Sequence, residues 1–176
     1  MNYKIGIDYG GTKIEGILID DKGEEILRKR SGYEKNYESG VKTIKNLVEE
    51  FDKHTNSKNS VGIGIPGSSS KENGLIKNAN SIWLNGKPFK KDLEMSLARE
   101  IKIMNDANCF ALSEAIDGSG ANYNTIWGVI IGSGFGGSFV HNKRVVEGVN
   151  QVAGDWGHQP LPYPREEEWD LNLKCP

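Results

Sequence analysis

The beginning of the chain carries the pattern of three short strands joined by turns. Residues 3–8 alternate between apolar and polar side chains and are rich in strand-forming residues, and residues 14–19 and 24–30 are further candidate strands. Residues 10–11 and 21–23 contain glycine-based turn signals between these runs. The pattern predicts that an antiparallel meander opens the chain.

Helical and strand patterns alternate after the meander. Residues 37–54 predict a helix, because apolar side chains recur there at spacings of three and four and form one stripe. The residues of this stripe are Val41, Ile44, Leu47, Val48 and Phe51. A short buried strand at 61–65 ends at Pro66-Gly67, and a polar irregular loop or hairpin follows at 68–88. The remaining pattern predicts a helix at 92–100, with Asp92 as its cap or first-turn acid, a strand at 101–104 and a helix at 107–116.

The pattern of the opening restarts beyond a candidate hinge at 118–120. A strand at 125–131, a glycine-rich turn at 132–137 and a hairpin at 139–146 are predicted, and residues 164–176 are charged without a clear period. Two meanders, each with a glycine turn between strands, therefore flank the hinge, which indicates a weak internal duplication. We expect an N-terminal lobe over residues 1–118 and the beginning of a second lobe over residues 119–176.

Composition narrows the class of protein. The chain has 176 residues, of which 36% are apolar and 26% charged, as in soluble globular proteins, but 22 are glycine, well above the usual share of about 7%. A net charge of −2 provides no basic surface for nucleic acid. The N-terminus lacks the pattern of a signal peptide, and no apolar run is long enough to span a membrane. Two cysteines, Cys109 and Cys175, do not form a disulfide framework, so we expect a reducing, cytoplasmic setting.

Two glycine turns are candidate phosphate sites. In the first, paired glycines let the backbone approach an anion and turn N–H groups toward it, a hydroxyl and an ammonium add donors, and an aspartate could hold a metal ion through water. These residues are Asp8, Gly10, Gly11, Thr12 and Lys13. The second turn, Gly132-Ser133-Gly134-Phe135-Gly136-Gly137, offers the same chemistry. Each is equally an ordinary glycine-rich hairpin, and the pairing of the two is more informative than either alone.

Three polar segments are candidate substrate sites. Asp106 follows Asn105 where a strand ends and a helix begins, so its carboxylate could accept a proton from a hydroxyl nucleophile, although spacing alone favours a helix cap. Asp155 and His158 could bind hydroxyls or a metal ion, or form a turn with a packed imidazole. Amide side chains between Asn78 and Asn85 match vicinal sugar hydroxyls and Trp83 could pack on a sugar ring, but a polar loop with one buried aromatic fits equally well.

Taken in order along the chain, these motifs resemble the ROK family of sugar kinases, and most closely its bacterial manno(fructo)kinase branch. Residues 8–13 resemble the family's first phosphate motif, and residues 132–134 its second. The segments at 65–67, 77–80 and 83–86 resemble its sugar-side loop, residues 105–108 its catalytic segment, and residues 154–158 its sugar and zinc motif. The resemblance covers nearly the whole chain.

The resemblance implies an α/β fold of the ribonuclease-H-like, actin/hexokinase-type ATPase class, with the N-terminal lobe complete and the second lobe truncated. It implies an ATP-dependent hexose kinase in which Asp106 is the general base that takes the proton from the sugar 6-hydroxyl. The implied sugar-binding residues are Gly67, Asn78, Asn80, Asn105, Asp155 and His158. Both glycine turns would bind ATP phosphates with Mg²⁺, and His158 with Cys175 would belong to a Zn²⁺ site in the full-length protein.

Departures from the family pattern shape further expectations. Asp155 stands where the family usually has glutamate, and Ser138 where another glycine is usual. The sequence stops at Pro176, before the remaining cysteines of the zinc motif, so one histidine and one cysteine cannot complete a four-ligand site. We therefore expect a fragment of a longer reading frame that is weakly active or inactive and that forms a homodimer or self-associates through exposed strand edges.

Alternative functions belong to other classes of protein. The leading expectation is a kinase for fructose, with mannose or glucose as further substrates. Sugar-responsive transcriptional regulators of the same family carry a helix-turn-helix ahead of the first strand, whereas here Met1 leads directly into that strand and Asp106 is present, both of which favour the enzyme. A non-catalytic, truncated binding module is the third alternative.

Overall fold

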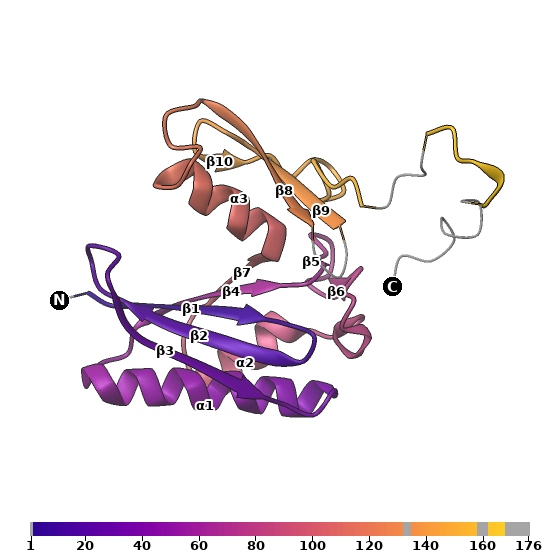
Figure 1. Ribbon diagram of the computed structural model, residues 1–176. Helices are drawn as coiled ribbons and strands as arrows, with labels where there is room; N and C mark the ends of the chain where they lie inside the picture. The colour runs from indigo at the N-terminus through magenta and orange to yellow at the C-terminus, as the bar shows by residue number, and fades with distance from the viewer. Residues whose placement is uncertain (1, 132–134, 158–161, 168–176) are drawn as a thin grey trace. The chain divides into compact units, whose positions relative to one another are not determined.

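A computed structural model describes residues 2–131, 135–157 and 162–167. The chain forms two compact units, Met1–Asp106 and Ala107–Pro176 (Figure 1). Among the described residues, no helix combines the length and the apolar composition needed to cross a membrane.

The first unit is built on a five-stranded sheet with the order β3-β2-β1-β4-β7. Strands β1 (Lys4–Tyr9), β2 (Lys13–Ile19) and β3 (Glu25–Gly32) form the predicted antiparallel meander. Strands β4 (Ser60–Ile65) and β7 (Lys102–Asn105) run parallel to β1. The sheet therefore changes from antiparallel to parallel pairing at β1.

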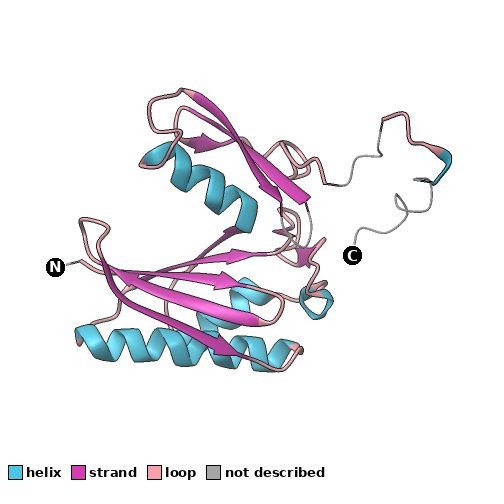
Figure 2. Ribbon diagram, in the orientation of Figure 1, coloured by secondary structure: helices cyan, strands magenta, loops and turns pink. Residues whose placement is uncertain are grey.

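Two helices lie together on one face of this sheet (Figure 2). Helix α1 (Tyr37–Thr55) begins where the side chain of Asn36 accepts a hydrogen bond of 2.8 Å from the N–H of Ser39, and it ends at Asn56, whose φ is 52°. The apolar stripe predicted for α1 packs against the sheet, with Phe51 and Val48 fully buried. The stripe thus provides the core of the first unit, as the spacing predicts.

Helix α2 (Phe89–Leu97) begins three residues before the predicted start and ends three residues before the predicted end. Phe89, Leu93 and Leu97 recur every four residues and are buried, so the apolar stripe begins immediately after Pro88. The helix stops because Ala98 has a left-handed conformation with φ of 49°. Asp92 lies in the first turn, as expected for an acidic residue there, but it is not the cap.

The loop between β4 and α2 contains a hairpin, one of the two alternatives predicted for residues 68–88. Strands β5 (Ser68–Ser69) and β6 (Ile76–Lys77) form a short hairpin, and a single turn of 3₁₀ helix, η1 (Ile82–Leu84), follows. Backbone hydrogen bonds join Ile76 to Lys87 and to Gly86, so the loop folds back on itself before α2. The hairpin alternative is therefore confirmed for part of this segment, and the rest is ordered by the segment's own hydrogen bonds.

The second unit consists of helix α3 (Asp106–Ile116) and a three-stranded sheet of order β10-β9-β8. The first residue of α3, Asp106, is the last residue of the first unit. The strands are β8 (Thr125–Ile131), β9 (Phe135–His141) and β10 (Arg144–Val145). Ala111 and Ala115 of α3 form a small core with Val140. A Cβ at Gly128 would lie 2.7 Å from the Cβ of Ala111, so glycine lets the helix approach the sheet.

Each unit contains an antiparallel hairpin of two long strands. The first hairpin pairs Ile5 with Leu18, Ile7 with Gly16 and Tyr9 with Ile14, and the second pairs Trp127 with Phe139, Val129 with Gly137 and Ile131 with Phe135. In the first unit this face is buried beneath α1. In the second unit Ile131 is 71% exposed, and loop residues Gly154 and Trp156 hydrogen-bond to the hairpin instead. The two hairpins therefore differ in what covers them, and also in the number of residues between their innermost paired positions, Tyr9–Ile14 and Ile131–Phe135.

Candidate functional site

Three segments far apart in the sequence leave the first unit's sheet at the same edge. Strands β1, β4 and β7 are parallel, and their register places Asp8 beside Gly64 and Ile65 beside Asn105. Three segments therefore emerge together at the carboxyl ends of these strands. They are the turn after β1, the Pro66-Gly67 corner after β4, and Asp106 after β7. Ligands of open α/β sheets bind at the carboxyl ends of parallel strands, so this edge is the candidate site.

Asn105 connects the end of β7 with the corner that follows β4. Its side-chain Nδ2 donates a hydrogen bond of 3.0 Å to the carbonyl oxygen of Gly67. Gly67 has φ of 86°, and a Cβ there would lie 2.5 Å from the carbonyl oxygen of Lys77 and 2.7 Å from the backbone N of Ala79. Only glycine fits this corner without strain, because both the dihedral angle and the space exclude a side chain.

The sugar-side loop presents two amide side chains to solvent. Asn78, which has a positive φ of 56°, and Asn80 are exposed, while Ala79 between them is buried. Asn85 fixes this arrangement, because its side chain accepts a 2.9 Å hydrogen bond from the N–H of Ala79 and donates one of 3.0 Å to the Ala79 carbonyl. These bonds fix the backbone between the two exposed amide side chains.

The turn after β1 presents backbone donors. The N–H of Gly10 donates to the carbonyl of Lys13 at 3.0 Å, and a Cβ at Gly10 would lie 2.7 Å from that oxygen. Gly11 and Thr12 are exposed, and no hydrogen bond within the described part of the chain uses their N–H groups. Two available backbone donors are the groups that the predicted phosphate site requires in this turn.

Asp8 is the carboxylate nearest to this turn in the sequence. Partial desolvation raises its pKa, the opposing Glu15 adds to the increase, and Arg30 counteracts it. Glu15 is itself held by Arg28 and Arg30. Asp8 is exposed and Glu15 is already paired, so Asp8 stays the predicted carboxylate for a metal ion held through water.

Asp106 lies at the junction of β7 and α3, as the sequence predicts. It is the first residue of the helix, and it is exposed. The partial positive charge at a helix N-terminus stabilises an ionised carboxylate. The ionised form is the one that a general base requires.

The candidates in the second unit are only partly described. Asp155 is half-buried, and its Oδ1 accepts a hydrogen bond of 3.2 Å from the N–H of Gly157, which corresponds to the turn considered as its alternative role. The predicted phosphate residues Gly132, Ser133 and Gly134, and the predicted zinc ligands His158 and Cys175, lie outside the described residues. Within residues 2–131, 135–157 and 162–167 no cluster of three or more metal-ligating side chains is present.

Two tyrosines near the site were missed by the sequence analysis. The hydroxyl of Tyr33 donates a hydrogen bond of 3.0 Å to the carbonyl of Gly10, and the indole N–H of Trp83 donates one of 3.0 Å to the hydroxyl of Tyr9. Trp83 is partly buried and contributes to an aromatic cluster with Tyr33, which is close to its alternative role as a buried aromatic. No local signal in the sequence connects these residues, because the partners are far apart along the chain.

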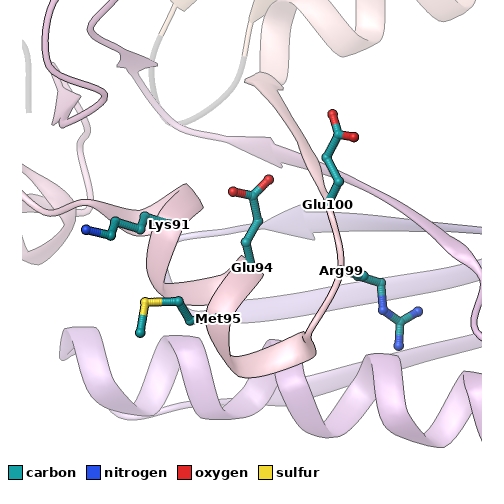
Figure 3. A pocket seen from close by; sticks show the side chains of 5 residues that line it. All are labelled: Lys91, Glu94, Met95, Arg99 and Glu100. Carbon is teal, nitrogen blue, oxygen red and sulfur yellow. The ribbon is translucent and has the colours of Figure 1, made fainter.

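A surface depression of about 420 Å³ lies elsewhere in the first unit. It is lined by Lys91, Glu94, Met95, Arg99 and Glu100 (Figure 3). Arg99 and Glu100 precede β7, so the depression lies toward the amino end of a strand whose carboxyl end carries Asn105. None of the candidate site residues lines it.

Comparison with known proteins identifies the class. The model of the ROK family matches residues 4–175, and the chain belongs to this family. An N-acetyl-D-glucosamine kinase of Vibrio parahaemolyticus is 40% identical over 158 residues, which cover 89% of this chain and 52% of the relative. A second such kinase, from Haemophilus influenzae, is 41% identical over 159 residues, 90% of this chain and 52% of the relative. The chain spans about half the length of these relatives.

Solved structures confirm the fold. A ROK glucokinase from Streptomyces griseus in complex with glucose and AMPPNP has a TM-score of 0.81 at 25% identity over 92% of this chain and 51% of its own. A ROK hexokinase from Thermus thermophilus has a TM-score of 0.78 at 25% identity over 91% of this chain and 54% of its own. A ROK transcriptional regulator at 18% identity and a TM-score of 0.79 shares the fold alone. The predicted α/β fold of the actin/hexokinase type is therefore confirmed.

Proposed function

We propose that this chain is part of an ATP-dependent sugar kinase in which Asp106 is the general base. The observation that supports this most directly is the convergence of the phosphate turn, the Gly67 corner and Asp106 at one edge of a single sheet. The sequence relatives that are N-acetyl-D-glucosamine kinases also support a sugar kinase.

In the proposed reaction, the Asp106 carboxylate accepts the proton of the sugar 6-hydroxyl as that oxygen bonds to the γ-phosphorus of ATP. The bond from the γ-phosphorus to the bridging oxygen breaks, and ADP leaves with the electron pair. Gly67, Asn78, Asn80 and Asn105 bind sugar hydroxyls. Asp155 and His158 have the same proposed role in the second unit.

Phosphate binding is assigned to the backbone donors of the first turn and to Lys13, with residues 132–134 as the proposed second contact. When bound, Mg²⁺ would neutralise negative charge on the β- and γ-phosphates. Asp8 is the residue proposed to hold it. Zn²⁺ in the longer protein stays a proposal that rests on His158 and Cys175 as two of four ligands.

The proposed sugar is N-acetyl-D-glucosamine. The expectation of fructose came from the resemblance to the manno(fructo)kinase branch, and the relatives do not support it, because those at 40 and 41% identity are N-acetyl-D-glucosamine kinases. A ROK glucokinase among the structural neighbours makes glucose the second candidate. Regulator function has weaker support, because the ROK regulator shares only the fold at 18% identity.

The test measures ADP release by the protein encoded by the complete gene, and by the 176-residue chain, with N-acetyl-D-glucosamine, glucose, mannose and fructose. We expect turnover by the complete protein and little or none by the shorter chain. Asp106→Asn should lower kcat roughly 10²- to 10⁴-fold, because the amide cannot accept the proton.

Asp117→Asn is the matched control, since Asp117 is an exposed aspartate immediately after the other end of α3. It should retain wild-type kcat. If the complete protein phosphorylates none of the four sugars, the kinase assignment is wrong. If folded Asp106→Asn keeps wild-type kcat, Asp106 is not the base.

A further inference from the structure

The phosphate turn is held from outside its own hairpin by a single phenol. Tyr33 lies between β3 and α1, and its hydroxyl donates to the carbonyl of Gly10 at 3.0 Å. The N–H of Gly10 donates to the carbonyl of Lys13. Both polar backbone groups of Gly10 are therefore engaged. The Gly10 carbonyl and the N–H of Gly11 belong to the same peptide unit. Because this unit is planar, the orientation of the carbonyl sets the orientation of the N–H.

The phenol of Tyr33 is itself held by a rigid aromatic cluster. Its ring lies 5.2 Å from that of Tyr9 and 6.2 Å from that of Trp83, both in edge-on arrangements. Tyr9 is 1% exposed, and its hydroxyl accepts the indole N–H of Trp83 at 3.0 Å. A Cβ at Gly40 of α1 would collide with the Tyr9 hydroxyl, so the helix backbone packs directly on that ring. The cluster therefore fixes the position of Tyr33 against α1 and η1.

We propose that Tyr33 is a positioning residue for the nucleotide, which aims the N–H groups of Gly11 and Thr12 at the phosphates by holding the Gly10 carbonyl. This inference rests on the proposed function, because it assigns a determinant of ATP binding in the same site. Preorganised donors contribute more to binding and catalysis than mobile ones, since no free energy is spent on ordering them. Loss of the phenol should therefore weaken the interaction with ATP while leaving the sugar contacts in place.

Tyr33→Phe removes the hydroxyl and keeps the ring. One hydrogen bond contributes about 0.5–1.5 kcal/mol, so KM for ATP should rise about 2- to 12-fold in the complete protein, with KM for the sugar changed less than about twofold. Tyr37→Phe is the matched control, because it also removes one tyrosine hydroxyl, but that hydroxyl donates to Asp92 at 2.6 Å and not to the turn. Its loss should affect stability and leave both KM values unchanged.

A second measurement does not depend on kinase activity. In ¹H–¹⁵N spectra of the 176-residue chain, Tyr33→Phe should shift the amide resonances of Gly11 and Thr12, and Tyr37→Phe should leave them in place. If the wild-type complete protein is inactive but these shifts appear, the proposed function fails and the positioning of the turn stands. If the wild type is active and Tyr33→Phe changes neither the amide resonances nor KM for ATP, the role assigned to Tyr33 is wrong.

Discussion

Replacing Gly67 with alanine tests the packing of the corner that places the sugar-side loop beside Asn105. The substitution has two costs in this structure. A φ of 86° costs an alanine about 1–2 kcal/mol. The new methyl would also lie 2.5 Å from the Lys77 carbonyl oxygen and 2.9 Å from the Cα of Ala79, and overpacking of this kind costs about 1–3 kcal/mol more. We expect a total loss of about 2–5 kcal/mol in the free energy of unfolding of the first unit.

Gly74→Ala separates the two costs. Gly74 has a similar φ of 72° in the same loop, but no atom lies within 4 Å of the position of its Cβ. It should therefore lose only about 1–2 kcal/mol, the dihedral component. Urea unfolding followed through the indole N–H resonance of Trp83 reports the first unit alone, because the other described tryptophans, Trp127 and Trp156, belong to the second. Equal destabilisation by the two substitutions would refute the argument from close packing.

Two further predictions concern the first unit. Asp52 and Arg99 form an ion pair, and their side chains are 15% and 12% exposed. Burial by itself would raise the pKa of Asp52, but hydrogen bonds from Arg99 and Asn59 lower it. This stabilisation is present above the unfolded pKa of about 3.9 and is lost as pH falls through the lower folded pKa. Asp52→Asn should cost about 3 kcal/mol at pH 7 and flatten the dependence of the urea midpoint on pH below about 4; an unchanged pH profile would contradict this. Phe51→Ala should cost about 3–5 kcal/mol by calorimetry, because its ring is fully buried, whereas Met95→Ala, 71% exposed, should stay within about 0.5 kcal/mol.

Local pattern alone was sufficient for most elements of the fold. The meander, α1 and the position of Asp106 at a strand-to-helix junction are confirmed, because side-chain periodicity and turn residues act over a few positions. The limits of α2 were wrong by three residues, since the burial of Phe89 begins the helix directly after Pro88. The resemblance of ordered motifs to the ROK family is also confirmed, although the preferred sugar was not supported.

Tertiary structure alone decided which segments meet. Insertion of β4 between β1 and β7 brings Gly67 to Asn105, and no periodicity specifies which strands become neighbours. The bonds from Tyr33 to Gly10 and from Trp83 to Tyr9 likewise join residues that are distant along the chain. Sequence pattern determines which face of an element is apolar, whereas the partner of that face depends on the packing of the whole unit, because hydrophobic burial is not directional.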